Sequence, residues 1–582
     1  MKTIILYSSL LLWTGLMLSA QEIPDFFKSA GSPANPKVQI AWNRYNSYEG
    51  ITRICHEISK AHPELARVES IGKSYEGRDI LVLTITNFQN RNPEDKPGFY
   101  IDGNIHSNEI QGSEIALYTA WYLTETYNSN AFIKELLDEK VFYIIPTINP
   151  DARNNFMFEL NIVHTPRSGM IPVDDDRDGL FDEDGFDDLD GDGNLLLMRR
   201  KTPYGRYNID PDNPLRMIRA ENGKFGEYEI LGYEGIDNDG DGEVNEDGVG
   251  FYDPNRDWSY NWQPDYIQDG ALPFPYYTPE NKAARDFVIR HPNIAGAQSY
   301  HNSGGMILRG PAQEKFMETY DPEDERVLNT IGEMGEKMLP GYKFITLWKD
   351  LYPVYGGEID WFYGARGIYV YTNELFTEWS YFSPKEPTHE DPENEMYDFD
   401  KYLLFGDAFI PWKEIDHPQY GKIEIGGFSK NFGRPEPGFM LESEAHRNMA
   451  FTLFHAYHIP LIKIDEIEVT DIENGLQQVD VSVVNTRLSP TRCGQNRKHD
   501  IDPEDRIIIE GAKAVGKMVV LDKDQNLTEV QTGDPSVIRL KNLPGMSVTR
   551  VRWITEKRKD IKITVNSNKG GKISKDHQPA PK

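Results

Sequence analysis

Two residues, His106 and Glu109, have the types and the spacing of a metal-binding pair. They follow a hydrophobic run, residues 98–104, that predicts a short buried strand, and they precede residues 112–123, whose apolar spacing predicts a helix. At such a strand-to-helix corner, side chains at positions i and i+3 point the same way. An imidazole nitrogen and a carboxylate oxygen suit Zn²⁺, and a catalytic zinc needs only three protein ligands plus water.

Four further motifs follow this pair along the chain. Alone, His-x-x-Glu is a weak signal, because thirteen histidines at the usual glutamate frequency give about one such pair by chance. Several unconnected motifs in a fixed order are much harder to produce by accident. The four are NPDAR (residues 149–153), DPNRDWSYNW (253–262), AQSYHNSGG (297–305) and YGGEIDWFYGARGIYVYTNEL (355–375).

The order and chemistry of these motifs resemble the zinc carboxypeptidases of the metallocarboxypeptidase (M14) family, the relatives of pancreatic carboxypeptidase A, over residues 38–460. The resemblance implies that His106, Glu109 and His301 bind one catalytic Zn²⁺ whose fourth position stays open. It also implies that Glu374 is the general base, which takes a proton from a zinc-activated water and delivers it to the leaving amine.

The resemblance also assigns residues to the substrate's terminal carboxylate. Asn255 and Arg256 match the pair that grips this group, and a guanidinium fork suits a carboxylate. Tyr352 aligns with the mobile tyrosine that closes over the substrate's C-terminus, and Tyr355 is its close rival.

One arginine in the family stabilises the oxyanion. The stretch LLLMRRKTPYGR, residues 195–206, resembles the family's Trp-Arg-Lys sequence, which selects Arg200 over Arg199.

Two acidic loops, residues 174–185 and 237–248, repeat the twelve-residue pattern D-x-D-x-D-G-x-x-[DN]-E-D-G, and residues 188–193 are a half-copy. Carboxylates at positions 1, 3, 5 and 9 around a glycine turn can wrap Ca²⁺. The glutamate that an EF-hand has at position 12 is replaced by glycine, so the loops resemble thrombospondin-type calcium loops; a plain solvated acidic loop is the alternative. The expected calcium ligands are Asp174, Asp176, Asp178 and Asp182 in the first loop and Asp237, Asp239, Asp241 and Asn245 in the second.

The predicted fold class is α/β, with a mixed sheet that carries helices on both faces. Residues 78–86 and 140–147 have the pattern of strands, and residues 279–290 and 442–458 that of helices. After Pro460 the pattern changes to short alternating strands, which predicts a β-sandwich. The expected organisation is a signal peptide (1–20), a catalytic domain (37–460) with an acidic insertion (about 170–250), a β-sandwich domain (461–565) and a disordered tail (566–582).

The N-terminal segment has the features of a secretory signal. Lys2 precedes an apolar core, and Ser19-Ala20 precedes the expected cut, so we expect a secreted or periplasmic protein without a membrane anchor. The two cysteines do not form a disulfide framework. Cys55 is expected to be a core thiol, and its pairing with Cys493 stays open.

These features predict a secreted zinc metallocarboxypeptidase that acts on the C-termini of peptides or proteins. The net charge of −31 and the absence of a basic stripe argue against a nucleic-acid partner. One alternative in the same chemistry is a peptidase or amidase that cleaves bacterial wall peptides. Another is a catalytically inactive, calcium-dependent binding protein, although the retention of both histidines and both glutamates argues against it.

Overall fold

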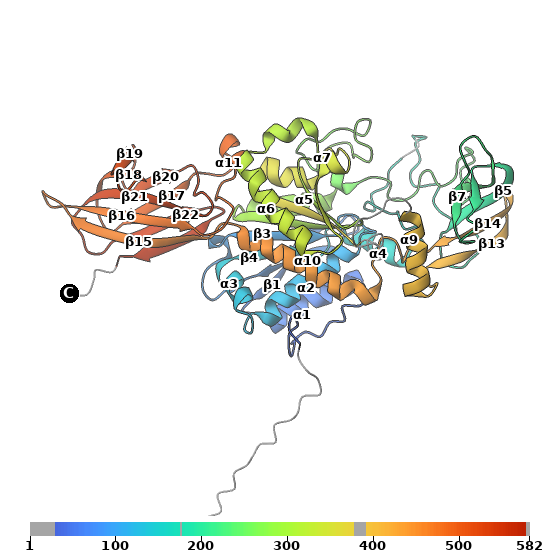
Figure 1. Ribbon diagram of the computed structural model, residues 1–582, viewed down its shortest axis with the longest axis horizontal. Helices are drawn as coiled ribbons and strands as arrows, with labels where there is room; N and C mark the ends of the chain where they lie inside the picture. The colour runs from blue at the N-terminus through green and yellow to red at the C-terminus, as the bar shows by residue number, and fades with distance from the viewer. Residues whose placement is uncertain (1–28, 175–176, 377–391, 578–582) are drawn as a thin grey trace, which may run out of the picture.

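Three blocks lie in a row along the longest axis of the molecule (Figure 1). A β-sandwich is at one end, an α/β domain is in the middle and a second antiparallel sheet is at the other end. This computed structural model describes residues 29–174, 177–376 and 392–577. The predicted signal peptide, residues 1–20, lies outside the described residues.

The α/β domain is built on an eight-stranded mixed sheet with the strand order β1-β2-β4-β3-β9-β12-β10-β11. The neighbours β4, β3, β9 and β12 run parallel. The strands are β1 (Ala66–Lys73), β2 (Asp79–Ile85), β3 (Gly98–Gly103), β4 (Val141–Ile145), β9 (Ile294–Asn302), β10 (Met306–Arg309), β11 (Lys343–Thr346) and β12 (Tyr369–Leu375).

Helices cover both faces of this sheet, as predicted. Alternate strand residues point to opposite faces. In β4, for example, Val141 and Tyr143 join a core with α5 and α6, whereas Phe142 and Ile144 join a core with α1, α2, α3 and α10. The helices are α1 (Tyr48–Ala61), α2 (Gln111–Thr126), α3 (Ala131–Glu139), α4 (Pro150–Phe158), α5 (Pro279–Arg290), α6 (Pro322–Met338), α7 (Leu347–Asp350), α8 (Glu358–Asp360), α9 (Pro392–Phe399), α10 (Gly438–His458) and α11 (Gly494–His499).

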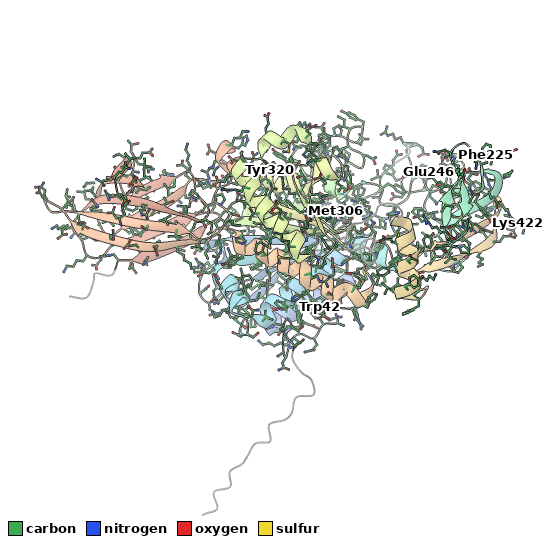
Figure 2. All side chains as sticks on the ribbon, viewed as in Figure 1. Trp42, Phe225, Glu246, Met306, Tyr320 and Lys422 are labelled. Carbon is green, nitrogen blue, oxygen red and sulfur yellow. The ribbon has the colours of Figure 1, made fainter. Side chains whose placement is uncertain are left out.

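A six-stranded antiparallel sheet, which we call the outer sheet, was not predicted from the sequence. Its strand order is β13-β14-β5-β8-β6-β7, and a small core of Leu196, Met198, Ile423 and Ile425 holds β5 and β14 together. Figure 2 shows Phe225 and Lys422 at this end of the molecule, away from Trp42 and Tyr320 in the α/β domain. The strands are β5 (Leu197–Gly205), β6 (Tyr207–Ile209), β7 (Met217–Arg219), β8 (Gly226–Tyr233), β13 (Phe409–His417) and β14 (Gly421–Phe428).

The C-terminal block is the predicted β-sandwich. One sheet has the order β15-β16-β21-β18-β19 and the other β20-β17-β22-β23. Val481, Ile507 and Trp553 are buried between the two sheets. The strands are β15 (Ile462–Asp471), β16 (Leu476–Asn485), β17 (Asp505–Glu510), β18 (Ala514–Asp522), β19 (Leu527–Val530), β20 (Val537–Leu540), β21 (Ser547–Glu556), β22 (Lys562–Ser567) and β23 (Gly571–Asp576).

The sandwich extends beyond the predicted boundary at residue 565, and the prediction of a disordered tail is wrong for residues 566–577. This segment completes β22 and forms β23, which pair as an antiparallel hairpin. Its polar composition is compatible with an edge strand, one face of which meets water. Gly571 has a φ of +81° next to the turn, so the glycines serve the hairpin.

The sandwich docks on the α/β domain through the turn of this hairpin. Lys569 is buried there and donates to the backbone oxygens of Arg366 at 2.6 Å and Gly367 at 2.8 Å. Its ammonium also forms an ion pair with Asp502 at 2.9 Å.

Both cysteines are free thiols, which answers the question that the sequence left open. Cys55 packs with Ile51, Ile54 and Ile58, as predicted, and Cys493 is buried near Gly367. Burial raises the pKa of both thiols to about 12, so neither is a reactive thiolate at neutral pH.

Within the described residues, no helix combines the length and the apolar character that crossing a bilayer requires.

Candidate metal centre and active site

The predicted zinc ligands meet at the carboxyl ends of β3 and β9. His106 and Glu109 lie in the loop between β3 and α2, closed by a hydrogen bond from the Glu109 amide to the His106 oxygen. His301 is near the end of the fully buried strand β9. The loop can be this short because β3 and α2 approach closely at Gly103 and Gly112, where a Cβ on Gly103 would lie 2.6 Å from the carbonyl carbon of Gly112.

The donor atoms of the three residues converge on one point. The Nδ1 atom of His106 lies 3.1 Å from Glu109 Oε1, and the Nδ1 atom of His301 lies 2.9 Å from Glu109 Oε2. The two Nδ1 atoms are 3.1 Å apart. Among the described residues, this is the one buried group of potential ligands that contains histidine.

This donor set fits Zn²⁺. Ligands at 2.0–2.1 Å from a tetrahedral ion lie roughly 3.3 Å from one another, close to the separations of these donors. The second ring nitrogen of each histidine contacts a carboxylate. His106 Nε2 lies 2.8 Å from Asp253 Oδ1, and His301 Nε2 lies 3.1 Å from Glu358 Oε1. A carboxylate on the outer nitrogen keeps the inner nitrogen free for a metal.

Asp253 connects His106 to two arginines. Its Oδ2 lies 3.4 Å from Arg167 Nε and 3.4 Å from Arg256 Nη2. Its Oδ1 also accepts a hydrogen bond from the backbone N–H of Asn255 at 2.7 Å. Burial opposes ionisation of Asp253, but the charges of Arg256, His106 and Arg167 outweigh it and hold the pKa of Asp253 well below its usual range. Asp253 is therefore an anion that orients three functional groups.

Glu374 stands next to the metal ligands. It lies on β12, in register with His301 on the adjacent parallel strand β9, so both side chains project from the same face of the sheet. Glu374 lines a cavity that Arg167, Arg256 and Arg434 also line. Burial and the nearby charge of Glu109 raise the pKa of Glu374 above its usual value.

Arg200, the predicted oxyanion arginine, is not brought to this site by the fold. It lies on β5 of the outer sheet, where it forms an ion pair with Glu229 at 2.8 Å, and it does not line the cavity. Within residues 195–206, the stretch that resembles the family's arginine sequence, residues 197–205 form strand β5.

Two other arginines occupy the space beside the ligands. Arg167 lies 2.9 Å from Glu109 Oε1, and Arg434 lies 3.2 Å from the same oxygen. Both guanidiniums line the cavity. The segment of Arg167 is tied to the ligand loop, because the Ser107 amide donates to the Arg167 oxygen at 3.2 Å.

The residues predicted to hold the substrate's carboxylate are near the site. Arg256 and Tyr352 line the cavity, and Tyr352 is 46% exposed. Tyr355, the rival of Tyr352, is not among the lining residues. Asn255 uses its side-chain oxygen to accept from the Glu358 amide at 2.8 Å, so it also supports the carboxylate behind His301.

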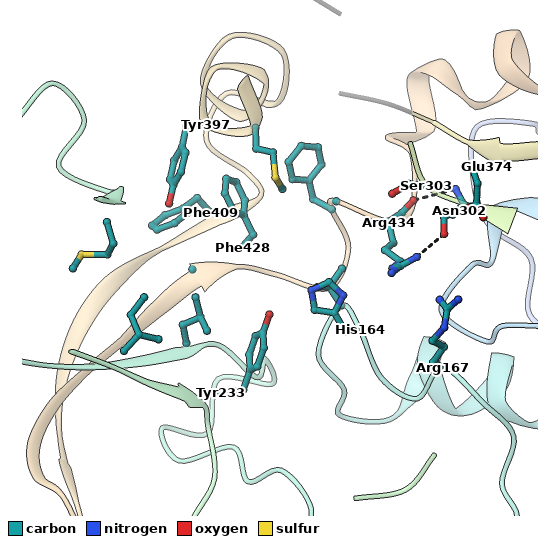
Figure 3. A pocket seen from close by; sticks show the side chains of 18 of the residues that line it. His164, Arg167, Tyr233, Asn302, Ser303, Glu374, Tyr397, Phe409, Phe428 and Arg434 are labelled. Carbon is teal, nitrogen blue, oxygen red and sulfur yellow. Dashed lines mark hydrogen bonds between the residues drawn. The ribbon is translucent and has the colours of Figure 1, made fainter. Parts of the chain in front are cut away.

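The cavity has a volume of about 870 Å³ and extends from these residues to the outer sheet. Figure 3 shows Glu374, Asn302 and Arg167 at one end, Arg434 and His164 in the middle, and Tyr233, Phe428, Phe409 and Tyr397 at the other end.

The acidic loops gather carboxylates, but partly in other combinations than predicted. Asp237, Asp239 and Asp241 form one group, as expected. Asp178 groups with Glu183 and with Asp239 of the other loop, instead of with Asp174 and Asp182, and Asp188 and Asp190 group with the buried Glu234. The side-chain nitrogen of Asn245 donates to the backbone oxygen of Tyr233 at 3.0 Å. Asp176 lies outside the described residues.

A comparison with protein families bears on this geometry. The family model described as zinc carboxypeptidase matches residues 51–154 and 236–397, which contain His106, Glu109, His301 and Glu374. The chain belongs to the zinc carboxypeptidase family. The gap in the match, residues 155–235, begins earlier and ends earlier than the insertion expected at about 170–250. A second model, described as a domain of unknown function (DUF8731), matches residues 461–578.

The enzyme is similar to several carboxypeptidases. Carboxypeptidase B of Astacus astacus is 25% identical over 348 residues, which cover 57% of this chain and 87% of the relative. The zinc carboxypeptidase of Saccharothrix mutabilis subsp. capreolus is 34% identical over 111 residues, 19% of this chain and 24% of the relative. The chain spans only 17% of the human carboxypeptidase Z, at 32% identity over 109 residues that make up 19% of this chain.

Solved carboxypeptidase structures were also matched. Thrombin activatable fibrinolysis inhibitor aligns with a TM-score of 0.42 and 16% identity over 72% of this chain and 75% of that one. Carboxypeptidase A from Helicoverpa armigera aligns with a TM-score of 0.38 and 19% identity over 64% of this chain and 75% of that one.

Four residues of this carboxypeptidase's site were missed from the sequence: Asp253, Glu358, Arg167 and Arg434. Asp253 and Glu358 stand inside quoted motifs, two residues before Asn255 and three residues after Tyr355, so their position was a usable signal. Arg167 lies between NPDAR and the acidic loops, and Arg434 lies in a segment far along the chain. Neither arginine is part of a recognisable sequence motif.

We expect Asp253→Asn to weaken zinc binding about tenfold or more, because loss of the carboxylate removes the charge that orients His106. The dissociation constant for zinc is measured by competition with a chelator of known affinity. The control is Asp265→Asn, an exposed carboxylate paired with Arg177 on the surface. Equal zinc affinity in the Asp253 variant and the wild type would contradict this role.

Proposed function

We propose that this protein is a secreted zinc carboxypeptidase that releases the C-terminal residue of peptides, with Glu374 as general base. The observation that carries the proposal is the position of Glu374, which shares a cavity with Arg256 and stands in register with the zinc ligand His301. A base beside the metal and a cation for a terminal carboxylate are the two requirements of such an exopeptidase.

His106, Glu109 and His301 hold the metal. When bound, zinc supplies Lewis acidity and makes water nucleophilic at neutral pH. Glu374 is an acceptor within the cavity for the proton of the attacking water. The same carboxyl group then donates the proton to the leaving nitrogen, which departs as a neutral amine and not as an anion.

Arg256 binds the α-carboxylate of the substrate. Asp253 and the backbone oxygen of Asn255, which accepts from Arg256 Nη1 at 2.9 Å, fix this guanidinium. Tyr352 lies in the same cavity and is exposed enough to move toward a bound C-terminus.

Arg167 is our choice for the oxyanion arginine in place of Arg200. Its guanidinium already contacts Glu109 and Asp253, so it is held where the carbonyl oxygen of the scissile bond develops charge.

Secretion is supported by the N-terminal sequence, in which a basic residue, an apolar core and a small-residue site follow one another.

The first prediction tests exopeptidase character. Two N-blocked peptides that differ only in a free or an amidated C-terminus are compared, and the amidated peptide should be cleaved at least about tenfold more slowly, because the amide cannot form the charged pair with Arg256. In Arg256→Met the two rates should converge. Equal cleavage of both peptides by the wild type would indicate an endopeptidase or amidase and would overturn the proposal.

The second prediction separates the two arginine assignments. Arg167→Met should lower kcat by roughly 10²–10³, the usual effect of removing one oxyanion donor, while Arg200→Met stays within about twofold of the wild type. Zinc content is measured in both variants, since Arg167 also contacts Glu109. The reverse pattern, a large loss in Arg200→Met alone, would restore the sequence-based assignment.

We also propose that the acidic loops bind Ca²⁺. The gathered carboxylates of Asp237, Asp239 and Asp241 support this, as does the contribution of Asp239 to the group of Asp178 and Glu183, because one ion shared by the two loops would hold them together. Burial, with the charges of Asp190 and Asp188 adding to it, raises the pKa of Glu234 to about 7, which shows how poorly this region tolerates its own charge.

Removal of calcium should therefore lower the melting temperature by several degrees. A ligand at 100 times its dissociation constant stabilises a folded protein by about 2.7 kcal/mol. Melting is followed with and without a calcium-selective chelator at constant zinc, in the wild type and in Asp239→Asn. The exposed Asp212→Asn, which lies outside the carboxylate groups, is the control. An unchanged melting temperature in the chelator would leave the repeats as plain acidic loops.

A further inference from the structure

The cavity continues well beyond the catalytic residues. Its far end is formed by the outer sheet and by α9, where aromatic and other apolar side chains face the cavity (Figure 3). The side chains that matter for the argument are Tyr233 of β8, Tyr397 of α9, Phe409 and Trp412 of β13, and Phe428 of β14.

Apart from α9, the elements that build this far end lie outside the residues matched by the family model. Tyr233 lies in the gap of the family match, and β13 and β14 lie after the end of the match at residue 397. The catalytic end, with His301 and Glu374, lies within the match. The strands that extend the cavity are therefore additional to the matched family residues.

The two ends differ in chemistry. Arg167, Arg256 and Arg434 make the catalytic end cationic, apart from the carboxylate of Glu374. His164 lies between the ends, and burial, followed by the charges of Arg434 and Arg167, lowers its pKa, so its ring is neutral at pH 7. Beyond it, the named side chains of the outer sheet are aromatic. The far end suits an apolar group and gives no counter-charge to an ion.

We propose that the outer sheet is a binding site for the substrate segment that precedes the scissile bond, and that it selects peptides with aromatic or other large apolar side chains several residues from the C-terminus. The proposal rests on the proposed function. If Arg256 holds the terminal carboxylate, only one substrate residue lies on that side of the scissile bond. Anything that fills the far end must then belong to the N-terminal side.

The size of the cavity agrees with such an occupant. Its volume of about 870 Å³ is in the upper part of the range for sites that enclose a drug-sized ligand (~300–1,000 Å³), which exceeds what one terminal residue requires. Tyr233 and Phe428 are only partly buried in the protein alone, so a substrate side chain can cover them further.

The first experiment varies the substrate and keeps the enzyme intact. Three N-blocked substrates share the same last two residues: the dipeptide itself, a hexapeptide with phenylalanine and leucine upstream, and a hexapeptide with serine upstream. We expect kcat/KM for the apolar hexapeptide to exceed that for the serine hexapeptide by at least about tenfold, as expected when one large apolar side chain is buried. Equal values for both hexapeptides would overturn the proposal.

The second experiment places the preference on the outer sheet. The measured quantity is the ratio of kcat/KM for the apolar hexapeptide to that for the dipeptide. In Tyr233→Ala and Phe428→Ala this ratio should fall at least about fivefold toward one. In Tyr204→Ala, which removes a 72% exposed tyrosine of the same sheet that does not line the cavity, the ratio should stay at the wild-type value.

The outcomes are distinguishable. If the wild type releases the C-terminal residue from all three substrates but the ratio is the same in Tyr233→Ala and the wild type, the binding site is wrong and the carboxypeptidase assignment stands. If the wild type cleaves none of them, or cleaves them internally, the proposed function itself fails. Melting curves test whether the variants are folded. If a variant is unfolded, the comparison of the three substrates with the wild type still tests the proposed preference.

Discussion

A single carboxylate, Asp253, connects His106, a proposed zinc ligand, to Arg167 and Arg256, the two arginines that we propose contact the substrate. It is buried, and its charge is stabilised only because three cationic or donor groups surround it. The dependence is mutual: Arg256 and Arg167 would lose their orientation without Asp253, and Asp253 would be a costly unpaired anion without them. The geometry of the cleft is thus maintained by a network rather than by the rigidity of any one loop.

A second group of acids lies behind His301. Glu358 contacts His301 Nε2, and Asp102 on β3 is buried nearby. Burial, and then the charge of Glu358, raises the pKa of Asp102 well above its usual range. The outer ring nitrogen of each histidine thus contacts one carboxyl group, Asp253 for His106 and Glu358 for His301, and this contact orients the ring.

The sequence predicted the residues that act close to one another in the chain or on regular strands. His106 and Glu109 are three residues apart, and His301 and Glu374 lie near the ends of buried strands, so each stands in a short motif that the family resemblance could place in order. Arg200 was chosen because residues 195–206 resemble the family's arginine stretch, whereas Arg167 stands in no such motif. The outer sheet could not be predicted, because β5 and β14 are far apart in sequence. In addition, neither segment alone has a hydrophobic face large enough to indicate a sheet. The tail was misjudged because an edge strand has the composition of a disordered segment.

The pairing of β5 with β14 constrains how such a chain can have changed over time. The two strands belong to separate segments additional to the matched family residues, one on each side of His301 in sequence, yet each supplies backbone partners of the other. A chain with only one addition would expose an unpaired strand edge and invite aggregation. The two additions are therefore expected to be inherited or lost together, and transplanting the outer sheet into another carboxypeptidase would require both segments at once.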